Sequence, residues 1–230
     1  MTDLLASPVA WLAITLVVFE GADILSRRSG RHPLCHPVLL ATPLLIVLLL
    51  LTRTSYPVYL GGTHVLGFLL GPAVVGLGVP IWQRRALIRR LALPILLALV
   101  AGAVTASVSA VAVLSLIGAP HAILASIAPR AVTTPVAMAM AHALGGVPSL
   151  AAAIVLFAGV IGAMAATPLF NLLQIRDYRA RGFAIGVSAH GFGTARAFQV
   201  DHTAGAFASL GMALNAIATC VLLSLLGFLI

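Results

Sequence analysis

Residues 126–173 read SIAPRAVTTPVAMAMAHALGGVPSLAAAIVLFAGVIGAMAATPLFNLL. The second half of this stretch, from Pro148 to Leu173, contains no Asp, Glu, Lys or Arg and is long enough to cross a hydrocarbon core of about 30 Å as a helix. The first half is also apolar, but Pro129 and Pro135 interrupt it around Arg130. A broken polar segment followed by an unbroken apolar helix is typical of a helical membrane protein that binds a ligand.

The composition of the whole chain agrees with this interpretation. Of 230 residues, 61% are apolar and 8% are charged, and the mean hydropathy is +1.15. Soluble domains are about 45–50% apolar with about a quarter of their residues charged. These values exclude an ordinary soluble enzyme, a secreted disulfide scaffold and a disordered chain. The apolar stretches are continuous, so we predict an all-α, polytopic membrane protein with about seven to eight membrane segments, including broken or re-entrant helices.

The broken-then-unbroken pattern occurs three times. The broken segments are GPAVVGLGVP (71–80), APRAVTTPVA (128–137) and AHGFGTARAF (189–198), and the apolar runs that follow them begin at Leu91, Pro148 and Ala204. We therefore predict one integral membrane domain over residues 1–230. It has two N-terminal helices within 1–55 and a core over 56–230 that contains an inverted repeat.

The positive charges predict the topology. The chain has 13 Lys plus Arg residues, five Asp plus Glu and a net charge of +8, and its basic clusters lie between the apolar runs. Such clusters mark cytoplasmic loops, so the charge does not indicate nucleic-acid binding. Keeping residues 176–181 in the cytoplasm requires segment 121–144 to re-enter from outside and segment 183–200 from the cytoplasm. The alternative, in which these segments span the membrane, stays open. We expect a multi-pass protein of the bacterial cytoplasmic membrane.

Two arginines within the broken segments predict an anion site. Arg130 and Arg196 would each cost about 2.5–3.5 kcal/mol near a bilayer centre, so they need a function or a partner. A guanidinium beside unwound backbone suits a carboxylate. The alternative is structural: Arg196 pairs with Asp201, and Arg130 caps carbonyls or reaches toward the interface. The predicted substrate-binding residues are Arg130, Thr133, Thr134, Ser188, His190, Gly191, Gly193, Thr194 and Arg196.

Proton coupling has two candidates, Glu20 in the first helix and His190 in the last broken segment. The neighbouring Asp23 has the spacing for an interfacial ion pair with Arg27. The His and Cys residues are scattered, so we expect neither a metal nor a cofactor. The chain lacks HExxH, GxSxG, Walker A and GxGxxG motifs, and we therefore do not expect an enzyme.

Four segments resemble the LrgB/CidB family: LLGPAVVGLGVPIW (69–82), SIAPRAVTTPVAM (126–138), GGVPSLAAAIVLFAGVIGA (145–163) and RGFAIGVSAHGFGTARAF (181–198). The resemblance covers nearly all of the chain from about residue 59 onward, and before that only hydrophobicity matches. Members of the family are described as antiholin-like modulators of murein hydrolase export and autolysis, with a small LrgA/CidA-like membrane partner. Related sequences form the membrane domain of the plastid glycolate/glycerate translocator, and bacterial relatives are linked to pyruvate uptake.

The resemblance therefore implies two functions. The first is a carrier for small monocarboxylates of the pyruvate, glycolate or glycerate type, working by alternating access. The second is an antiholin-like modulator of murein hydrolase export that acts through protein contacts in the membrane. Arg130 and Arg196 favour the carrier, because a holin-type role needs only apolar helices. The expected partners are a small carboxylate, the bilayer, a small LrgA/CidA-like protein and further copies of the chain.

Overall fold

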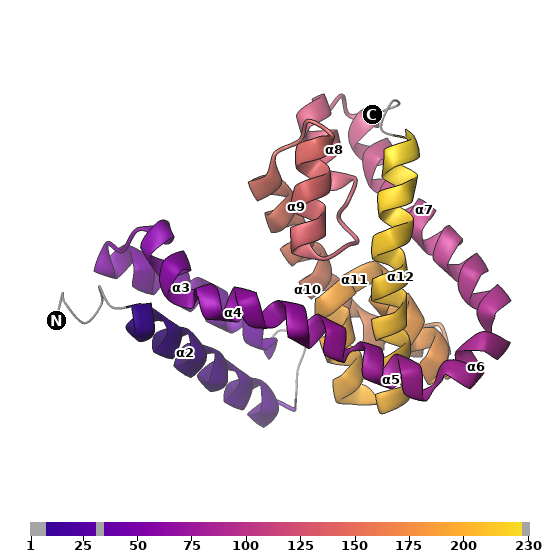
Figure 1. Ribbon diagram of the computed structural model, residues 1–230, viewed down its shortest axis with the longest axis horizontal. Coiled ribbons are helices and arrows are strands. Elements are labelled where there is room, and N and C mark those ends of the chain that lie inside the picture. The colour runs from indigo at the N-terminus through magenta and orange to yellow at the C-terminus, as the bar shows by residue number, and fades with distance from the viewer. Residues whose placement is uncertain (1–7, 31–34, 227–230) are drawn as a thin grey trace. The chain divides into compact units, whose positions relative to one another are not determined.

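The computed structural model describes residues 8–30 and 35–226, and these residues form helices joined by short loops (Figure 1). The chain divides into two compact units, with the boundary between Gly76 and Leu77. Within the described residues, five helices are long and apolar enough to cross a membrane. They are Val9–Arg28, Tyr56–Gln83, Ala92–Leu116, Pro148–Leu172 and His202–Leu226. The chain is thus an all-helical protein with several candidate membrane spans.

The first unit contains three helices: α2 (Pro8–Arg28), α3 (Pro37–Thr52) and α4 (Tyr56–Gly76). Trp11 on α2 is 1% exposed, and its ring meets the edge of Tyr59 on α4 at 5.7 Å between centroids. The Thr15 hydroxyl lies 3.3 Å from the Tyr59 hydroxyl. These contacts join α2 to α4, whereas most of the other large apolar side chains of this unit are exposed, as they would be toward lipid.

The second unit is built around three long helices. Its elements are α5 (Gly78–Gln83), α6 (Arg85–Arg90), α7 (Ala92–Leu116), α8 (His121–Ile127), α9 (Thr134–Ala143), α10 (Pro148–Leu172), α11 (Tyr178–Val200) and α12 (His202–Leu226). The unbroken apolar runs predicted from the sequence are α7, α10 and α12, and they end within a few residues of the predicted limits where the structure describes them. Residues 227–230 of the last predicted run lie outside the described residues.

The segment predicted to be broken at 71–80 is helical instead: α4 continues through Pro72, and α4 and α5 together give the candidate span Tyr56–Gln83. The broken segment around Arg130 folds back on itself. Helices α8 and α9 are joined by the irregular residues 128–133, and α9 returns toward the start of α8. At the open end, a Cβ on Gly145 would lie 3.4 Å from the His121 ring. Near the other end of α8, the Ser126 hydroxyl accepts a hydrogen bond from the backbone N–H of Val147 at 2.8 Å, so the chain that leaves α9 runs alongside α8. Segment 121–144 therefore begins and ends at the same end of the unit.

The second broken segment, α11, has the same form. Its helix is interrupted at Ala189 and His190, and His190 has φ 39° and ψ −126°, a conformation that residues other than glycine rarely adopt. After the break, Gly193 packs against the Ile185 carbonyl, and one recess is lined by residues from both ends of the helix, Tyr178 and Val200. The two halves of α11 thus form a hairpin, hereafter the α11 hairpin. The α8–α9 pair is called the α8–α9 hairpin.

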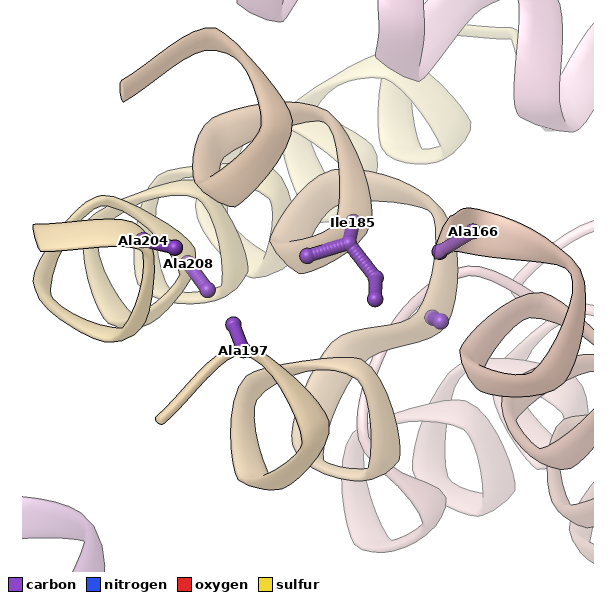
Figure 2. Packing of buried hydrophobic residues seen from close by; sticks show 6 residues of the cluster. Ala166, Ile185, Ala197, Ala204 and Ala208 are labelled. Carbon is purple, nitrogen blue, oxygen red and sulfur yellow. The ribbon is translucent and has the colours of Figure 1, made fainter. Parts of the chain in front are cut away.

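Small residues bring the α11 hairpin against α12. A Cβ on Gly182 would collide with the backbone of Ala204, and one on Gly186 with the backbone of Ala208. Figure 2 shows Ala197, from the second half of α11, pointing toward Ala208, with Ile185 lying between Ala208 and Ala166 of α10. Backbones approach this closely only where side chains are absent or are single methyl groups. The α11 hairpin lies beside the first half of α12 (Figure 1), and the turn of the α8–α9 hairpin reaches the middle of α12 at Asn215.

Candidate functional site

The turn of the α11 hairpin is buried against α10. His190 is 2% exposed, and its Nε2 lies 3.2 Å from the carbonyl oxygen of Val155. A Cβ on Gly159 would be 2.6 Å from the His190 ring, so only glycine admits the imidazole there. The Thr194 hydroxyl is also buried and donates a hydrogen bond of 2.8 Å to the His190 carbonyl. Of the predicted site residues, the structure thus brings together His190, Thr194 and the buried Gly193.

Ser188 and Gly191 lie on either side of this turn, and both are exposed. The Ser188 hydroxyl donates to the Ala184 carbonyl at 2.8 Å, within its own half-helix. A Cβ on Gly191 would meet no atom within 4 Å. These two residues therefore face away from the packed side of the hairpin, and only a ligand that approaches from the open side would reach them.

Arg130 lies in the turn of the α8–α9 hairpin and opens onto a separate cavity. Its side chain is half-buried, and its Nε donates a hydrogen bond of 3.1 Å to the Ala106 carbonyl of α7. The cavity measures about 510 Å³, and its lining residues are Ser109, Ala110, Val113, Leu114, Ile127, Arg130, Ile154, Phe157 and Ala158. Arg130 is the one charged residue among these apolar and small neighbours. Thr133 and Thr134 follow it at the start of α9, and both are half-buried.

Ser107 is a polar residue near Arg130 that the sequence reasoning missed. It follows Ala106, whose carbonyl holds the Arg130 guanidinium, and it is 2% exposed. Among the described residues its hydroxyl is the buried side-chain polar atom for which no hydrogen-bond partner is present. A buried hydroxyl without a partner costs free energy, so a ligand that formed a hydrogen bond with Ser107 would recover that cost. Serine in an apolar helix is too common to be singled out from sequence alone.

Arg196 does not share the Arg130 cavity. It is half-buried in the second half of α11, and its Nη1 donates to Gln199 Oε1 at 3.3 Å. It lines a small recess of about 20 Å³, enough for one water, whose other charged member is Arg181. No residue lines both this recess and the Arg130 cavity. Arg181 is held by the Ile175 carbonyl and by Asn171 Oδ1 at 2.7 Å.

The acidic residues considered from the sequence have local partners. Asp201 precedes α12, and its Oδ1 accepts hydrogen bonds from the backbone N–H groups of Thr203 at 2.6 Å and Ala204 at 3.0 Å, which is the geometry of a helix cap. Glu20, in the first unit, is 61% exposed and lies 3.3 Å from Arg27. Arg27 also donates to Asp23 at 2.7 Å, as the spacing predicted.

The loop before α11 contains a further ion pair. Arg179 donates to Asp177 through Nε at 3.0 Å and Nη2 at 2.6 Å. This hydrogen bonding from Arg179 lowers the pKa of the Asp177 carboxyl, so the pair stays charged well below neutral pH. Within residues 8–30 and 35–226, the structure contains no group of three or more His, Cys, Asp or Glu residues that could hold a metal ion.

Asn215 is a completely buried polar residue that the sequence reasoning passed over. It lies in the middle of α12, is 0% exposed, and its Nδ2 donates to the carbonyls of Ala131 at 2.8 Å and Val187 at 3.1 Å. One of these acceptors belongs to each hairpin. A lone Asn in an otherwise apolar run was the available signal, because polar groups within membrane segments are expensive.

Comparison with known proteins assigns most of the chain to a single family model. The model described as the LrgB-like family matches residues 15–228. YxaC of Bacillus subtilis is 34% identical over 90% of this chain and 92% of its own length, and YwbG of the same organism is 31% identical over 95% and 97%. The Holin-like protein CidB of Staphylococcus epidermidis is 30% identical over 95% of both chains. No solved structure matches the chain.

Proposed function

Because the chain belongs to the LrgB-like family, we propose that it carries small monocarboxylates of the pyruvate, glycolate or glycerate type across the bacterial cytoplasmic membrane by alternating access. The observation that carries this proposal is the meeting of two helical hairpins at one buried amide, with an arginine opening onto a cavity beside them. Secondary transporters build substrate sites from pairs of broken helices in this way.

The Arg130 cavity has the chemistry for a small carboxylate. A guanidinium binds both oxygens of a carboxylate, and it does so more strongly in apolar surroundings than in water. The cavity is an open depression, since Val113 and Phe157 on its wall are largely exposed, and a small carboxylate would reach Arg130 from its open side. Ser109 also lines the cavity, and its hydroxyl would bind the keto or hydroxyl oxygen of the substrate. Thr133 and Thr134 follow Arg130 in sequence but do not line the cavity, so they would contact the substrate only after a rearrangement of the turn.

Arg196 and Arg181 form the second cationic position of the proposed pathway. Their recess lies at the open end of the α11 hairpin, whereas Arg130 lies in the turn of the α8–α9 hairpin. The α11 hairpin packs along the first half of α12, and the turn of the α8–α9 hairpin contacts the middle of α12 at Asn215, so both broken segments meet one helix, as the proposed inverted repeat requires. We propose that the carboxylate meets one cationic position from each side, with Ser188, Gly191, Gly193 and Thr194 near the path. His190 or Glu20 would carry a coupled proton.

Uptake into proteoliposomes tests the proposal. Purified protein is reconstituted, and the initial uptake of labelled pyruvate, glycolate and glycerate is measured with and without a pH gradient. We expect saturable uptake of at least one of the three that unlabelled substrate inhibits. Empty liposomes are the control. Absence of uptake of all three under both conditions, from protein that is monodisperse before reconstitution, would contradict the proposal.

We expect Arg196→Lys to slow uptake while leaving the protein folded. Lysine keeps the charge but replaces a planar fork with a point charge, so one hydrogen bond is lost and the KM for the carboxylate rises by about fivefold to tenfold. Arg176→Lys in the exposed loop before α11 is the matched control and should leave KM unchanged. Wild-type kinetics in the Arg196→Lys protein would assign Arg196 a structural role.

The relatives support a second function. CidB of Staphylococcus is named a holin-like protein, so this chain would act as an antiholin-like modulator of murein hydrolase export and autolysis, through contacts with a small LrgA/CidA-like protein or with further copies of itself. The large exposed apolar side chains of the first unit are available for such contacts. Deletion that alters autolysis, together with the absence of carboxylate uptake, would favour this function over transport.

A further inference from the structure

A single buried amide connects the two hairpins of the second unit. The Asn215 side chain, on α12, is completely buried, and its Nδ2 donates one hydrogen bond to the Ala131 carbonyl and one to the Val187 carbonyl. Ala131 is 84 residues away along the chain and Val187 is 28 residues away. Both protons of one amide are therefore used to join segments that are distant in sequence.

Both acceptors are carbonyls that lie where the regular helix is interrupted. Ala131 lies in the irregular turn between α8 and α9, and Val187 lies just before the break at Ala189 and His190. In an unbroken helix the Val187 carbonyl would accept from the N–H of residue 191, four positions later. In apolar surroundings such a freed carbonyl must be satisfied internally. Asn215 satisfies one from each hairpin.

The amide is oriented by its neighbours. Only its NH₂ group can donate, so the orientation that places Nδ2 toward two carbonyls is the one that forms both bonds. Thr219, one helical turn later and also completely buried, places its hydroxyl 3.5 Å from Asn215 Oδ1. Val132 and Val155 pack beside Ala216, so the apolar surroundings of the amide come from the α8–α9 hairpin, α10 and α12.

We propose that Asn215 is a positioning residue that couples the two hairpins, so that a movement of one changes the position of the other. This inference rests on the proposed transport function, in which the hairpins move relative to α12. A hairpin that moves with its bond intact takes the amide with it, and the second bond of the amide then draws the other hairpin along. A ligand at Arg130, one residue before Ala131, would in this way affect the α11 hairpin.

The first test measures the coupling without a substrate. Cys35→Ser and Cys220→Ser remove the native thiols, and a single cysteine is placed at the half-buried Thr133 or at the buried Thr194, one reporter on each hairpin. The rate of maleimide labelling is compared in the reconstituted protein with and without Asn215→Leu. Losing one hydrogen bond on each hairpin should raise both labelling rates about tenfold.

Ser209→Ala is the matched control. Ser209 is a buried polar residue on the same helix, but its hydroxyl donates to the Gly205 carbonyl of its own helix at 3.0 Å. We expect this variant to leave both labelling rates unchanged. An increase at only one reporter, or at neither, would overturn the proposal. This outcome does not depend on uptake, so failure of the transport function and failure of the coupling are distinguishable.

The second test separates coupling from simple loss of structure. Asn215→Asp keeps the shape of the side chain, but a protonated carboxyl has one proton to donate and an ionised carboxylate has none. We expect its Vmax, relative to wild type at the same pH, to fall about tenfold as the pH rises, with KM little changed. The same ratio for Asn215→Leu should not depend on pH. A ratio for Asn215→Asp that is independent of pH would overturn the assignment.

Discussion

Replacing Gly186 by leucine should abolish the folded protein, and Gly186→Ala should destabilise it by about 3 kcal/mol. A Cβ at this position would collide with the backbone oxygen of Ala208 on α12, and a backbone in the middle of a packed helix cannot move aside as a side chain does. Either replacement at Gly186 pushes the α11 hairpin away from α12, and the position of the hairpin depends on that contact. The measurement is the fraction of protein that stays monodisperse in detergent after heating to a series of temperatures, which gives a melting temperature for each variant.

Gly191→Ala is the matched control. Gly191 belongs to the same hairpin, but a Cβ there would meet no atom within 4 Å, so the expected change in stability is at most about 0.5 kcal/mol. Gly182→Ala should behave like Gly186→Ala, because its Cβ would collide with the Ala204 backbone. Equal melting temperatures for Gly186→Ala and Gly191→Ala would contradict the close contact between α11 and α12.

Arg130→Gln should reduce carboxylate uptake about 10- to 100-fold. The guanidinium is the one charged group that lines the 510 Å³ cavity, and a hydrogen bond to a charged group contributes about 1.5–3 kcal/mol. Glutamine keeps a donor near the Ala106 carbonyl but loses the charge. The measurement is kcat/KM for pyruvate or glycolate in proteoliposomes, together with the melting temperature of the variant.

Arg89→Gln provides the control for the loss of one positive charge. Arg89 lies in the exposed basic helix α6, so its replacement should leave kcat/KM unchanged. Uptake by Arg130→Gln at the wild-type rate, from protein of unchanged stability, would remove the Arg130 cavity from the transport pathway. If uptake and the melting temperature both fell, the hydrogen bond from Arg130 to Ala106 would be needed for stability, and the loss of uptake would follow from the loss of structure.

The long helices and two of the three predicted breaks could be predicted because both depend on local sequence, whereas segment 71–80 continues as helix through Pro72. An apolar run such as Pro148–Leu172 has to form a helix in lipid, and prolines such as Pro129 and Pro135 interrupt one. The sequence could not show that each broken segment returns to the end where it begins, because this depends on contacts between residues that are distant in sequence. The bond from Val147 to Ser126 and the packing of Gly193 on Ile185 are examples.

The site was only partly predictable for the same reason. Arg130, His190 and Thr194 were identifiable because charged and polar groups are rare in apolar segments. The sequence could not show that Arg130 and Arg196 line different recesses, since that depends on how the hairpins pack. Gly182 and Gly186 were visible as a G-x-x-x-G pair within GFAIG, a known signal of close helix contact that the sequence reasoning did not use.

The position of Asn215 along the chain sets an order of assembly during synthesis. At about 5–20 residues per second, the ribosome reaches Asn215 about 1 to 6 s after Val187 and about 4 to 17 s after Ala131. Until then the two carbonyls lack their donor, and Gly182 and Gly186 lack the helix against which they pack. Neither hairpin can therefore complete its native contacts before α12 is synthesised. The second unit closes only after α12 has been inserted.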